Sequence, residues 1–315
     1  MVDFVEARKI VEKKDKGMKS KLMSLKDAVK LINDGDLIAI GGCMYSRSPI
    51  AALHEIIRQK KSNLTVSKAL TSFDGELMLA SGCAKGIITS WLSVAVVYGV
   101  SKVMRHLVQN RLAAYEEWSH YTMALRFKAG AMGVPFLPTL SLLGSDMIKH
   151  TSAKEITCPF TGQKIALVPA LFPDVGVIHV HAADEYGNAQ IEGYRFCDED
   201  IARASSKVIV TAEKIVSNNK IRREPDKTAV PFFCVDAVVE VPFGSYPGEC
   251  YGLYEADLKH IAEYAQYGID KGLEGAKEYI QKYIHGTASH EEFLSTFPLS
   301  RLLDRQRTVR EILGE

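Results

Sequence analysis

The chain has 315 residues, 47% of them apolar and 24% charged, which is enough for a substantial buried core in one large domain or two small ones. Thirty-nine basic residues against 38 acidic ones give a net charge of +1, so the balance indicates no nucleic acid and no acidic membrane surface as a partner. Six scattered cysteines without a CxxC pair, no leader-like start and a longest apolar run of only residues 87–100 predict no metal ribbon, no disulfide framework, no membrane span and a reducing cytoplasm.

The amino-terminal part of the chain has the pattern of a basic helix followed by alternating helices and strands. Lysines cluster in the first 30 residues, and we interpret residues 1–23 as a basic helical extension with a solvated face. Ser24 is a candidate helix cap, because Asp27 follows at the third helical position. The expected elements are then a strand at Leu37–Ile40, a helix from about Pro49 to Lys60, a strand at Leu64–Ser67, a helix at Gly75–Ser81 and a strand at Gly86–Trp91.

The middle of the chain adds one long helix and four strands. Met123, Phe127 and Ala131 recur at helical spacing, which predicts a helix over Glu116–Met132 that Gly133 closes. Runs of β-branched residues predict strands at Ile165–Val168, Val175–His181, Val208–Thr211 and Val235–Val241. Strands that alternate with helices favour an α/β fold with an open, mainly parallel sheet and helices on both faces.

The last part of the chain, after Tyr254, is charged, helical in pattern and without strand runs. We therefore divide the chain into the extension 1–23, an α/β domain over residues 24–254 and a helical carboxyl-terminal extension over residues 255–315. We expect this last part to pack on the sheet domain or on a partner, and not to form an independent catalytic domain.

A strand-to-helix corner is the strongest local signal. The apolar strand Leu37–Ile40 runs into Gly41 and Gly42, and Pro49 follows where a first helical turn begins. A glycine pair lets the backbone approach another group closely, and exposed N–H groups at such a corner can bind an anion or an oxyanion. The same pattern also fits a structural turn, so the corner alone leaves both interpretations open.

This corner begins an ordered series of motifs that resembles the A subunits of family I CoA-transferases, with the glutaconate type most similar. The series runs from about Ser24 to Tyr254 and departs from the family at Cys43, where the family usually has Phe. Its members are Asp34-Gly35, Gly41-Gly42, Pro49, Val134–Pro138, Val168-Pro169, Pro173–Val175, Ala182–Asn188, Ile221–Arg223, Val235–Val239 and Cys250–Tyr254.

The resemblance implies an activity that this chain shares with a partner. In these enzymes a glutamate of the B half attacks the acyl-CoA thioester, which divides one difficult acyl transfer into easier steps. That glutamate lies in a Ser-Glu-Asn-Gly-like motif, which this sequence lacks. The implied function is an A subunit that moves CoA between an acyl-CoA and a carboxylic acid. It works with a B subunit, takes the coenzyme A thioester as substrate, and needs no metal and no organic cofactor.

The resemblance also gives His120 a place in the site. Transferases of the family carry there a Gln, near a helix start, that donates to the thioester oxyanion. An imidazole N–H can replace that donor, and an imidazole can also move protons near neutral pH. A steroid-ring hydrolase of the same fold carries Glu at this position, so a hydrolase or a C–C lyase or decarboxylase of a CoA thioester is the alternative. An ordinary polar residue near a helix start is the third interpretation.

Four further residues are candidates for the substrate site. Arg47 could pair with the distal carboxylate of a dicarboxylic acyl group or lie in solvent, and Ser46 could hydrogen-bond the acyl chain or cap a helix. Cys43 is either a nucleophile at a helix start or a small buried residue. Asn188 belongs to a turn that the family places at the carboxyl end of a central strand, where ligands gather in open α/β sheets.

Two other classes of function have weaker support. His179 and His181 share one face of a predicted strand, but no third metal ligand lies at a recognised spacing. Sugar-phosphate isomerases and sugar-sensing regulators have a related sheet topology, which leaves a ligand-binding module as a further alternative. Regulators of that type carry a helix-turn-helix motif, and only a single basic helix is expected here.

Overall fold

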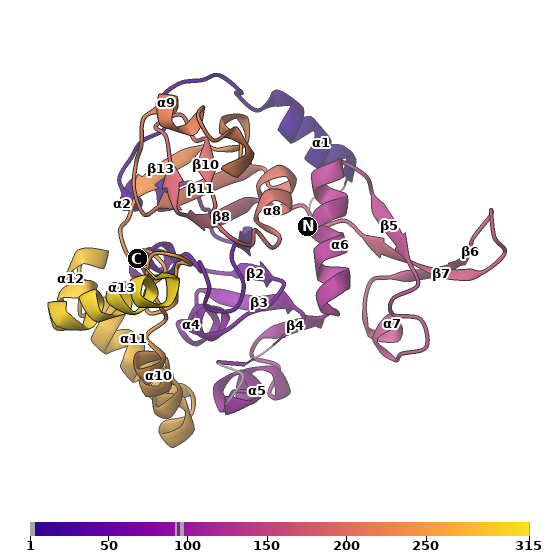
Figure 1. The fold of residues 1–315 in the computed structure, drawn as a ribbon. Helices are drawn as coiled ribbons and strands as arrows, with labels where there is room; N and C mark the ends of the chain where they lie inside the picture. The colour runs from indigo at the N-terminus through magenta and orange to yellow at the C-terminus, as the bar shows by residue number, and fades with distance from the viewer. Residues whose placement is uncertain (1–3, 92, 95–97, 315) are drawn as a thin grey trace.

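A seven-stranded parallel sheet with helices on both faces forms the centre of the molecule (Figure 1). The computed structural model describes residues 4–91, 93–94 and 98–314. The strand order is β13-β11-β8-β1-β2-β3-β4, and every neighbouring pair is parallel. The strands are β1 (Leu37–Ile40), β2 (Leu64–Lys68), β3 (Ala84–Thr89), β4 (Ala114–Glu117), β8 (Val175–Val180), β11 (Lys207–Ala212) and β13 (Ala237–Glu240). The predicted fold class is therefore confirmed.

The two faces of the sheet are covered by different helices. Along β1, Ile38 and Ile40 belong to one buried cluster, which also holds the apolar side chains of α2, α3, α4 and α5. Leu37 and Ala39 belong to the second cluster, with side chains of α6 and α8. This alternation is what a strand buried on both faces requires. The helices of this part are α1 (Phe4–Lys13), α2 (Leu25–Val29), α3 (Ile50–Arg58), α4 (Phe73–Ala80), α5 (Lys102–Gln109), α6 (His120–Met132), α7 (Met147–His150), α8 (Asp198–Ala204) and α9 (Asn218–Ile221).

The direction in which the chain adds strands reverses at β1. From β1 the chain builds β2, β3 and β4 on one side, and it then returns to place β8, β11 and β13 on the other. In open α/β sheets a crevice forms at such a switch point, outside the carboxyl ends of the strands. Here the segment after β1 contains the glycine pair, so the glycine pair lies at this switch point of the sheet.

The predicted helix at Glu116 begins too early. Residues up to Glu117 form the edge strand β4, which pairs in parallel with β3, and the helix starts at His120. Ser119 caps it, because its hydroxyl accepts from the Thr122 N–H while the Thr122 hydroxyl accepts from the Ser119 N–H. The side chains of β4 are partly or fully exposed and two of the four are glutamates, so no apolar alternation marked this strand in the sequence.

The strand predicted at Ile165–Val168 exists but does not join the main sheet. It is part of β7 (Lys164–Pro169), the middle strand of an antiparallel sheet with β5 (Phe136–Thr139) and β6 (Lys154–Thr157). These strands form an arm that projects beside α6 (Figure 1). Alternate residues of β7 are half-exposed, which is typical of a sheet with one covered face. A third small sheet consists of β9 (Ala182–Ala183), β10 (Ala189–Gln190) and β12 (Thr228–Val230).

The amino-terminal extension is helical only over α1, and residues 16–24 have little regular structure. Its lysines are not all solvated: Lys14 lies 2.7 Å from Asp236, and Lys21 donates to the carbonyl oxygen of Phe232 at 2.6 Å. Within the ranges that the structure describes, no helix has the length and apolar character needed to cross a membrane. Residues 92 and 95–97 of the apolar run lie outside the described residues, as do residues 1–3 and 315 of the two extensions.

The carboxyl-terminal extension is helical, as predicted, and shares a core with the sheet. Aromatic side chains such as Tyr264, Tyr279 and Phe293 belong to the same buried cluster as Ile38 and Ile40 of β1. This shared core shows that the extension is an integral layer over one face of the sheet. Its helices are α10 (Leu258–Lys271), α11 (Leu273–Ile280), α12 (His290–Ser295) and α13 (Leu299–Leu313), with a π-helical turn at Gln281–His285.

Glu76 lies beneath this layer, and its burial predicts a pH-dependent stability. Desolvation raises the pKa of its carboxyl from 4.5 to about 7, although Tyr264 donates to it at 2.8 Å. The folded state therefore favours the protonated carboxyl. The stability that depends on this protonation is fully present below pH 4.5 and is lost as the pH rises through about 7. The free energy of unfolding of Glu76→Gln, relative to that of the native chain, is expected to rise by about 2–3 kcal/mol when the pH is raised from 5 to 8. Urea unfolding at both pH values measures this difference.

The exposed Glu274, which pairs with Lys277 on α11, provides the control for that experiment. Glu274→Gln removes a solvated carboxylate, so its effect on the free energy of unfolding is expected to be the same at both pH values. A Glu76→Gln difference that also stays constant between pH 5 and pH 8 would show that Glu76 does not titrate in this range.

Candidate active site

The glycine pair has a steric role in the structure. The Gly41 N–H donates to the carbonyl oxygen of Val177 at 2.9 Å, and the Gly42 N–H donates to Oδ1 of Asp198 at 2.8 Å. A Cβ atom at Gly41 would lie 2.3 Å from the same Asp198 oxygen. Both N–H groups have partners inside the chain, so a backbone anion site at Gly41 and Gly42 stays a prediction that requires these hydrogen bonds to open. Gly41 is needed so that the end of β1 can approach the first residue of α8, and Gly42 is needed for the tight turn of the loop that follows.

Arg47 is buried and does not lie in solvent. Its side chain is 1% exposed, and Nη2 lies 2.8 Å from Oδ2 of Asp198, which is 0% exposed. The guanidinium also donates to the carbonyl oxygens of Tyr194 at 2.8 Å and His179 at 3.3 Å. In this conformation the charge of Arg47 is balanced within the chain by Asp198. Recognition of an acyl carboxylate by Arg47 therefore stays a prediction that requires this ion pair to open.

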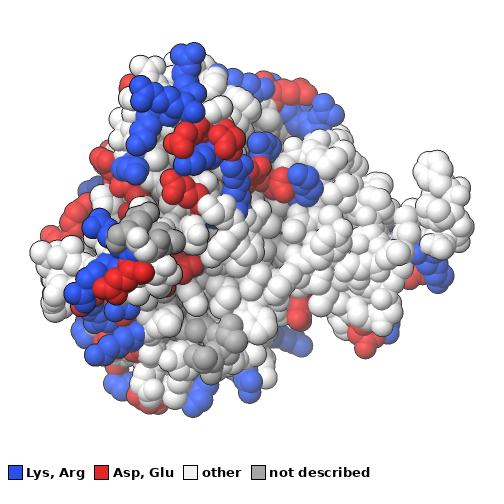
Figure 2. Space-filling view, in the orientation of Figure 1, with Lys and Arg blue, Asp and Glu red and all other residues white. Residues whose placement is uncertain are grey.

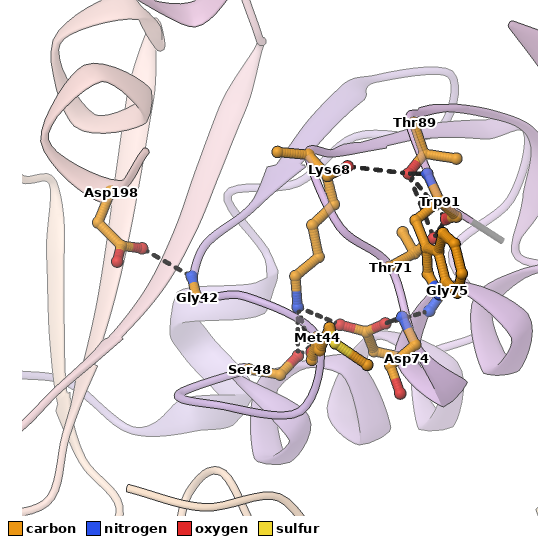
Figure 3. Close-up of polar contacts among 12 residues, drawn as sticks. Gly42, Met44, Ser48, Lys68, Thr71, Asp74, Gly75, Thr89, Trp91 and Asp198 are labelled. Carbon is orange, nitrogen blue, oxygen red and sulfur yellow. Dashed lines mark hydrogen bonds and ion pairs between the residues drawn. The ribbon is translucent and has the colours of Figure 1, made fainter. Parts of the chain in front are cut away.

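A second buried ion pair holds the other side of the loop between β1 and α3. Nζ of Lys68 lies 2.5 Å from Oδ2 of Asp74, and both side chains are 0% exposed. The ammonium also donates to the carbonyl oxygen of Met44 at 2.8 Å, and the Ser48 hydroxyl donates to Asp74 at 2.6 Å. Figure 3 shows Asp198 approaching Gly42 from one side while Lys68, Ser48 and Asp74 meet on the other.

The residues of these two ion pairs were not identified from the sequence, apart from Arg47. Lys68 is the last residue of the largely buried strand β2, and Asp74 lies in the first turn of α4. A lysine that ends a buried strand is the one available signal, because Lys is almost never fully buried unless it is paired. Asp198 gives no such signal, since it is one of three consecutive acidic residues at the start of α8.

Cys43 and Ser46 lie inside the clamped loop, the segment between β1 and α3 that the two ion pairs hold. Burial raises the pKa of the Cys43 thiol to about 11, which keeps it protonated near neutral pH and agrees with the small-residue interpretation. Ser46 is buried, and its hydroxyl accepts from the Tyr194 hydroxyl at 3.1 Å. Neither observation tests whether Cys43 or Ser46 binds the acyl group, so both assignments to the substrate site stay predictions.

Asn188 helps to fold its own loop. Its side-chain amide donates to Asp184 at 2.8 Å, and its side-chain oxygen accepts from the Phe232 N–H at 3.2 Å. The other carboxylate oxygen of Asp184 accepts three backbone N–H groups of the same turn. The predicted turn is therefore present, with Asn188 engaged in it, and it joins β9 to β10 shortly after β8 ends.

His179, which lies in β8, and His181, which follows β8, both have structural hydrogen bonds. His179 contacts Thr211 at 2.9 Å through Nδ1 and Glu213 at 2.7 Å through Nε2. His181 contacts the carbonyl oxygen of Tyr251 at 2.7 Å through Nε2 and accepts from the Glu192 N–H through Nδ1. His179, Glu213 and Cys250 place donor atoms within 4.8 Å of one another. The Glu213 carboxylate already accepts from Tyr254 and from two backbone N–H groups, so this cluster is a hydrogen-bonded network.

His120 is the exposed member of the candidate set. It is the first residue of α6 and therefore follows β4 at the carboxyl edge of the sheet. Its Nδ1 lies 2.6 Å from the hydroxyl oxygen of Ser90, the residue after β3. The indole of Trp91 packs edge-on against the imidazole, with ring centroids 6.4 Å apart. The ring is thus oriented by neighbours on one side and open on the other.

A wide cleft lies away from these residues. It has a volume of about 890 Å³ and is lined by residues 22–26, the end of α3 and residues 287–291. None of the predicted site residues lines it. Of the predicted site residues, His120 lies at the surface, whereas Gly41, Gly42, Ser46 and Arg47 are buried.

A methyl group at Gly42 is expected to be poorly tolerated. Gly42 has φ +71°, and its Cβ would lie 2.3 Å from the carbonyl oxygen of Ser46 and 2.6 Å from that of Arg47. We expect Gly42→Ala to lower the free energy of unfolding by about 2 kcal/mol or more, measured by urea unfolding. Gly35→Ala is the matched control, because Gly35 has φ +89° but no atom near its Cβ position. Equal losses in the two variants would contradict a steric role for Gly42.

Comparisons with known proteins agree on one family. A family model described as Coenzyme A transferase matches residues 22–241. The chain is 33% identical over 303 residues to the A subunit of glutaconate CoA-transferase from Acidaminococcus fermentans, and this match covers 90% of this chain and 94% of that protein. The crystal structure of glutaconate coenzyme A-transferase from the same organism matches with a TM-score of 0.87 at 33% identity, over 91% of this chain and 96% of that one.

Two similar proteins have other activities in their names. The crystal structure of a variant of the decarboxylase AibA/AibB matches with a TM-score of 0.74 at 29% identity, over 84% of this chain and 98% of that one. The cholesterol ring-cleaving hydrolase IpdA subunit of Mycobacterium tuberculosis is 25% identical over 301 residues, covering 90% of this chain and 100% of that protein. These similarities extend along most of the chain, so the same architecture accompanies transfer, decarboxylation and hydrolysis.

Proposed function

We propose, from the premise that the chain belongs to the coenzyme A transferase family, that it is the A subunit of a heteromeric CoA-transferase of the glutaconate type. It would move CoA between an acyl-CoA and a carboxylic acid, with the coenzyme A thioester as substrate and no further cofactor. The observation that carries this proposal is the similarity in sequence and fold, along nine-tenths of the chain, to the A subunit of a glutaconate CoA-transferase. The six cysteines are free, which fits work in a reducing cytoplasm.

The reaction needs a carboxylate nucleophile, which we assign to a B subunit. Support comes from the surface beside His120, where α6 and the projecting arm carry few charges on the face shown in Figure 2. Large apolar side chains of α6 and of the arm are exposed, among them Tyr121, Met132, Phe136, Leu140 and Phe160, and Phe160 in the arm is 94% exposed. Exposed apolar surface of this kind marks interaction sites. A B subunit docked on this face would bring its glutamate toward His120.

Co-expression with a B subunit tests the proposal. The purified complex is incubated with a panel of acyl-CoAs, with and without dicarboxylic, aromatic and 3-oxo acids, and the products are identified by mass spectrometry. The expected result is CoA on the acceptor acid, formed only when an acceptor is present. A complex that exchanges CoA with none of these acids would overturn the proposal.

A second candidate is a hydrolase, lyase or decarboxylase acting on a CoA thioester. The contact between Ser90 and His120 favours it, because a hydrogen-bonded imidazole can act as acid or base, which an amide cannot. In the same assay this function would give an acyl-CoA that gains water or loses CO2 without any acceptor. The two outcomes are distinguished by mass and by the need for the acceptor acid.

A further inference from the structure

A chain of three polar groups reaches His120 from the neighbouring strands. Ala69 follows β2, Ser90 follows β3 and His120 opens α6 after β4, so the three lie at adjacent carboxyl ends of the sheet. The Ser90 hydroxyl is in hydrogen-bond contact with the carbonyl oxygen of Ala69, which also accepts the Ser90 N–H at 3.2 Å. The same hydroxyl oxygen lies 2.6 Å from Nδ1 of His120.

The number of protons available to these three groups fixes the direction of each hydrogen bond. Two oxygen atoms in hydrogen-bond contact share one proton, and the carbonyl of Ala69 has none to give. The Ser90 hydroxyl proton therefore points to Ala69. Its oxygen can then only accept at the second contact, so Nδ1 of His120 must be the donor. A neutral imidazole carries a single N–H, and it follows that Nε2 holds a lone pair.

The surroundings hold the ring in this orientation and leave Nε2 open. Trp91 packs edge-on against the imidazole with an interplanar angle of 77°, and the capping box of Ser119 and Thr122 fixes the first turn of α6. Among the residues that the structure describes, Nε2 of His120 has no hydrogen-bond partner, and the side chain is exposed. Nε2 is therefore the atom that a substrate or a partner protein meets.

We propose that Ser90 is a positioning residue that fixes the Nδ1–H tautomer of His120, so that Nε2 of the neutral ring accepts a proton and only the imidazolium donates there. The catalytic relevance of His120 rests on the proposed function, and this inference adds to that function a role for Ser90. A glutamine amide at this position can donate in every protonation state. His120 instead takes a proton at Nε2, becomes an imidazolium, and returns the same proton from Nε2. The residue thus suits reactions in which a proton moves, in addition to oxyanion stabilisation.

Nitrogen NMR of the imidazole tests the tautomer directly. The full chain, by itself and in complex with the B subunit, is prepared with 15N-labelled histidine, and the His120 signals are assigned by their loss in His120→Gln. With the ring neutral, the expected spectrum has a protonated, pyrrole-type Nδ1 and an unprotonated, pyridine-type Nε2. A neutral ring with the proton on Nε2 would overturn the proposal, and this result needs no variant of Ser90.

Variants of Ser90 then test the cause. Ser90→Ala removes the acceptor and is expected to lose the pure Nδ1–H pattern in favour of a mixture of tautomers, while Ser90→Thr keeps a hydroxyl and restores it. Ser81→Ala is the matched control, since Ser81 is also a half-buried serine whose hydroxyl donates to a backbone carbonyl, but it precedes β3. An unchanged tautomer in Ser90→Ala would overturn the role of Ser90.

The tautomer and the reaction are measured separately. The NMR pattern needs no turnover, so a complex without CoA transfer would leave the tautomer assignment standing. Conversely, transfer activity together with an Nε2–H tautomer would support the proposed function and reject this inference.

Discussion

Replacing Asp198 by alanine is expected to lower the free energy of unfolding by about 3–5 kcal/mol. The variant leaves the guanidinium of Arg47 buried at 1% exposure without its carboxylate, and removal of one partner of a buried pair leaves an uncompensated charge. It also removes the acceptor of the Gly42 N–H, which Asp198 binds at 2.8 Å. Both losses fall on the loop after β1, so the same variant is expected to reduce activity of the assembled complex.

Urea unfolding measures this effect, and α8 supplies its own control. Asp200 lies two residues further along the helix and pairs with Lys128 at 3.4 Å, with side chains 21% and 54% exposed. Asp200→Ala is expected to cost less than about 1 kcal/mol, as exposed pairs do. The double variant Arg47→Met/Asp198→Ala removes both charges and should recover part of the loss, with a coupling of about 0.5–3 kcal/mol. Equal losses at positions 198 and 200 would refute the buried ion pair as a source of stability.

Replacing His120 by alanine is expected to lower kcat for CoA transfer by about 10²–10³, the usual effect of removing one oxyanion donor, which at this position is the Nε2–H of the imidazolium. His120→Gln should recover most of the transfer, because the amide supplies a donor at the same place. Both variants should fold normally, since the imidazole is exposed and, within the described part of the chain, its ring nitrogens make a single hydrogen bond, to Ser90. The measurement is the rate of CoA transfer by the complex with the B subunit.

The same two variants separate transfer from hydrolysis. If the complex hydrolyses or decarboxylates its acyl-CoA, the amide cannot replace an acid–base group, and His120→Gln should lose at least about a hundredfold. His150→Gln changes an exposed histidine at the end of α7 and should alter neither activity. Full activity in His120→Ala would remove His120 from the site.

The central strands could be predicted from the sequence because burial on both faces leaves an apolar record. β1 and β8 are completely buried, and their runs of apolar and β-branched residues mark them clearly. β4 is an edge strand with no buried side chain and two glutamates, and β5 contains Pro138. Such strands are specified by the neighbours with which they pair, and pairing leaves no local pattern for a single sequence to show.

The site could be predicted only where its signals are local. The positive φ of Gly42 and the turn at Asn188 depend on nearby residues, and both lie where the sequence predicts a turn. The functions of their polar groups depend on distant residues. Asp198 accepts the hydrogen bond of the Gly42 N–H and forms an ion pair with Arg47. No residue near position 42 or 47 indicates this partner in the sequence. The fold brings these groups together, which explains why the corner alone fitted an anion site equally well.

The clamped loop also has a consequence for how the chain folds. Its contacts with Lys68 and Asp74 span only 20 to 26 residues of sequence, whereas the contact between Gly42 and Asp198 spans 156. Closing a long loop costs more conformational entropy than closing a short one, and distant contacts form more slowly. The contacts of the loop with Lys68 and Asp74 can therefore form while only the first strands of the sheet are present. The contact with Asp198 must wait until β8 and α8 arrive, so the site becomes complete among the last events of folding.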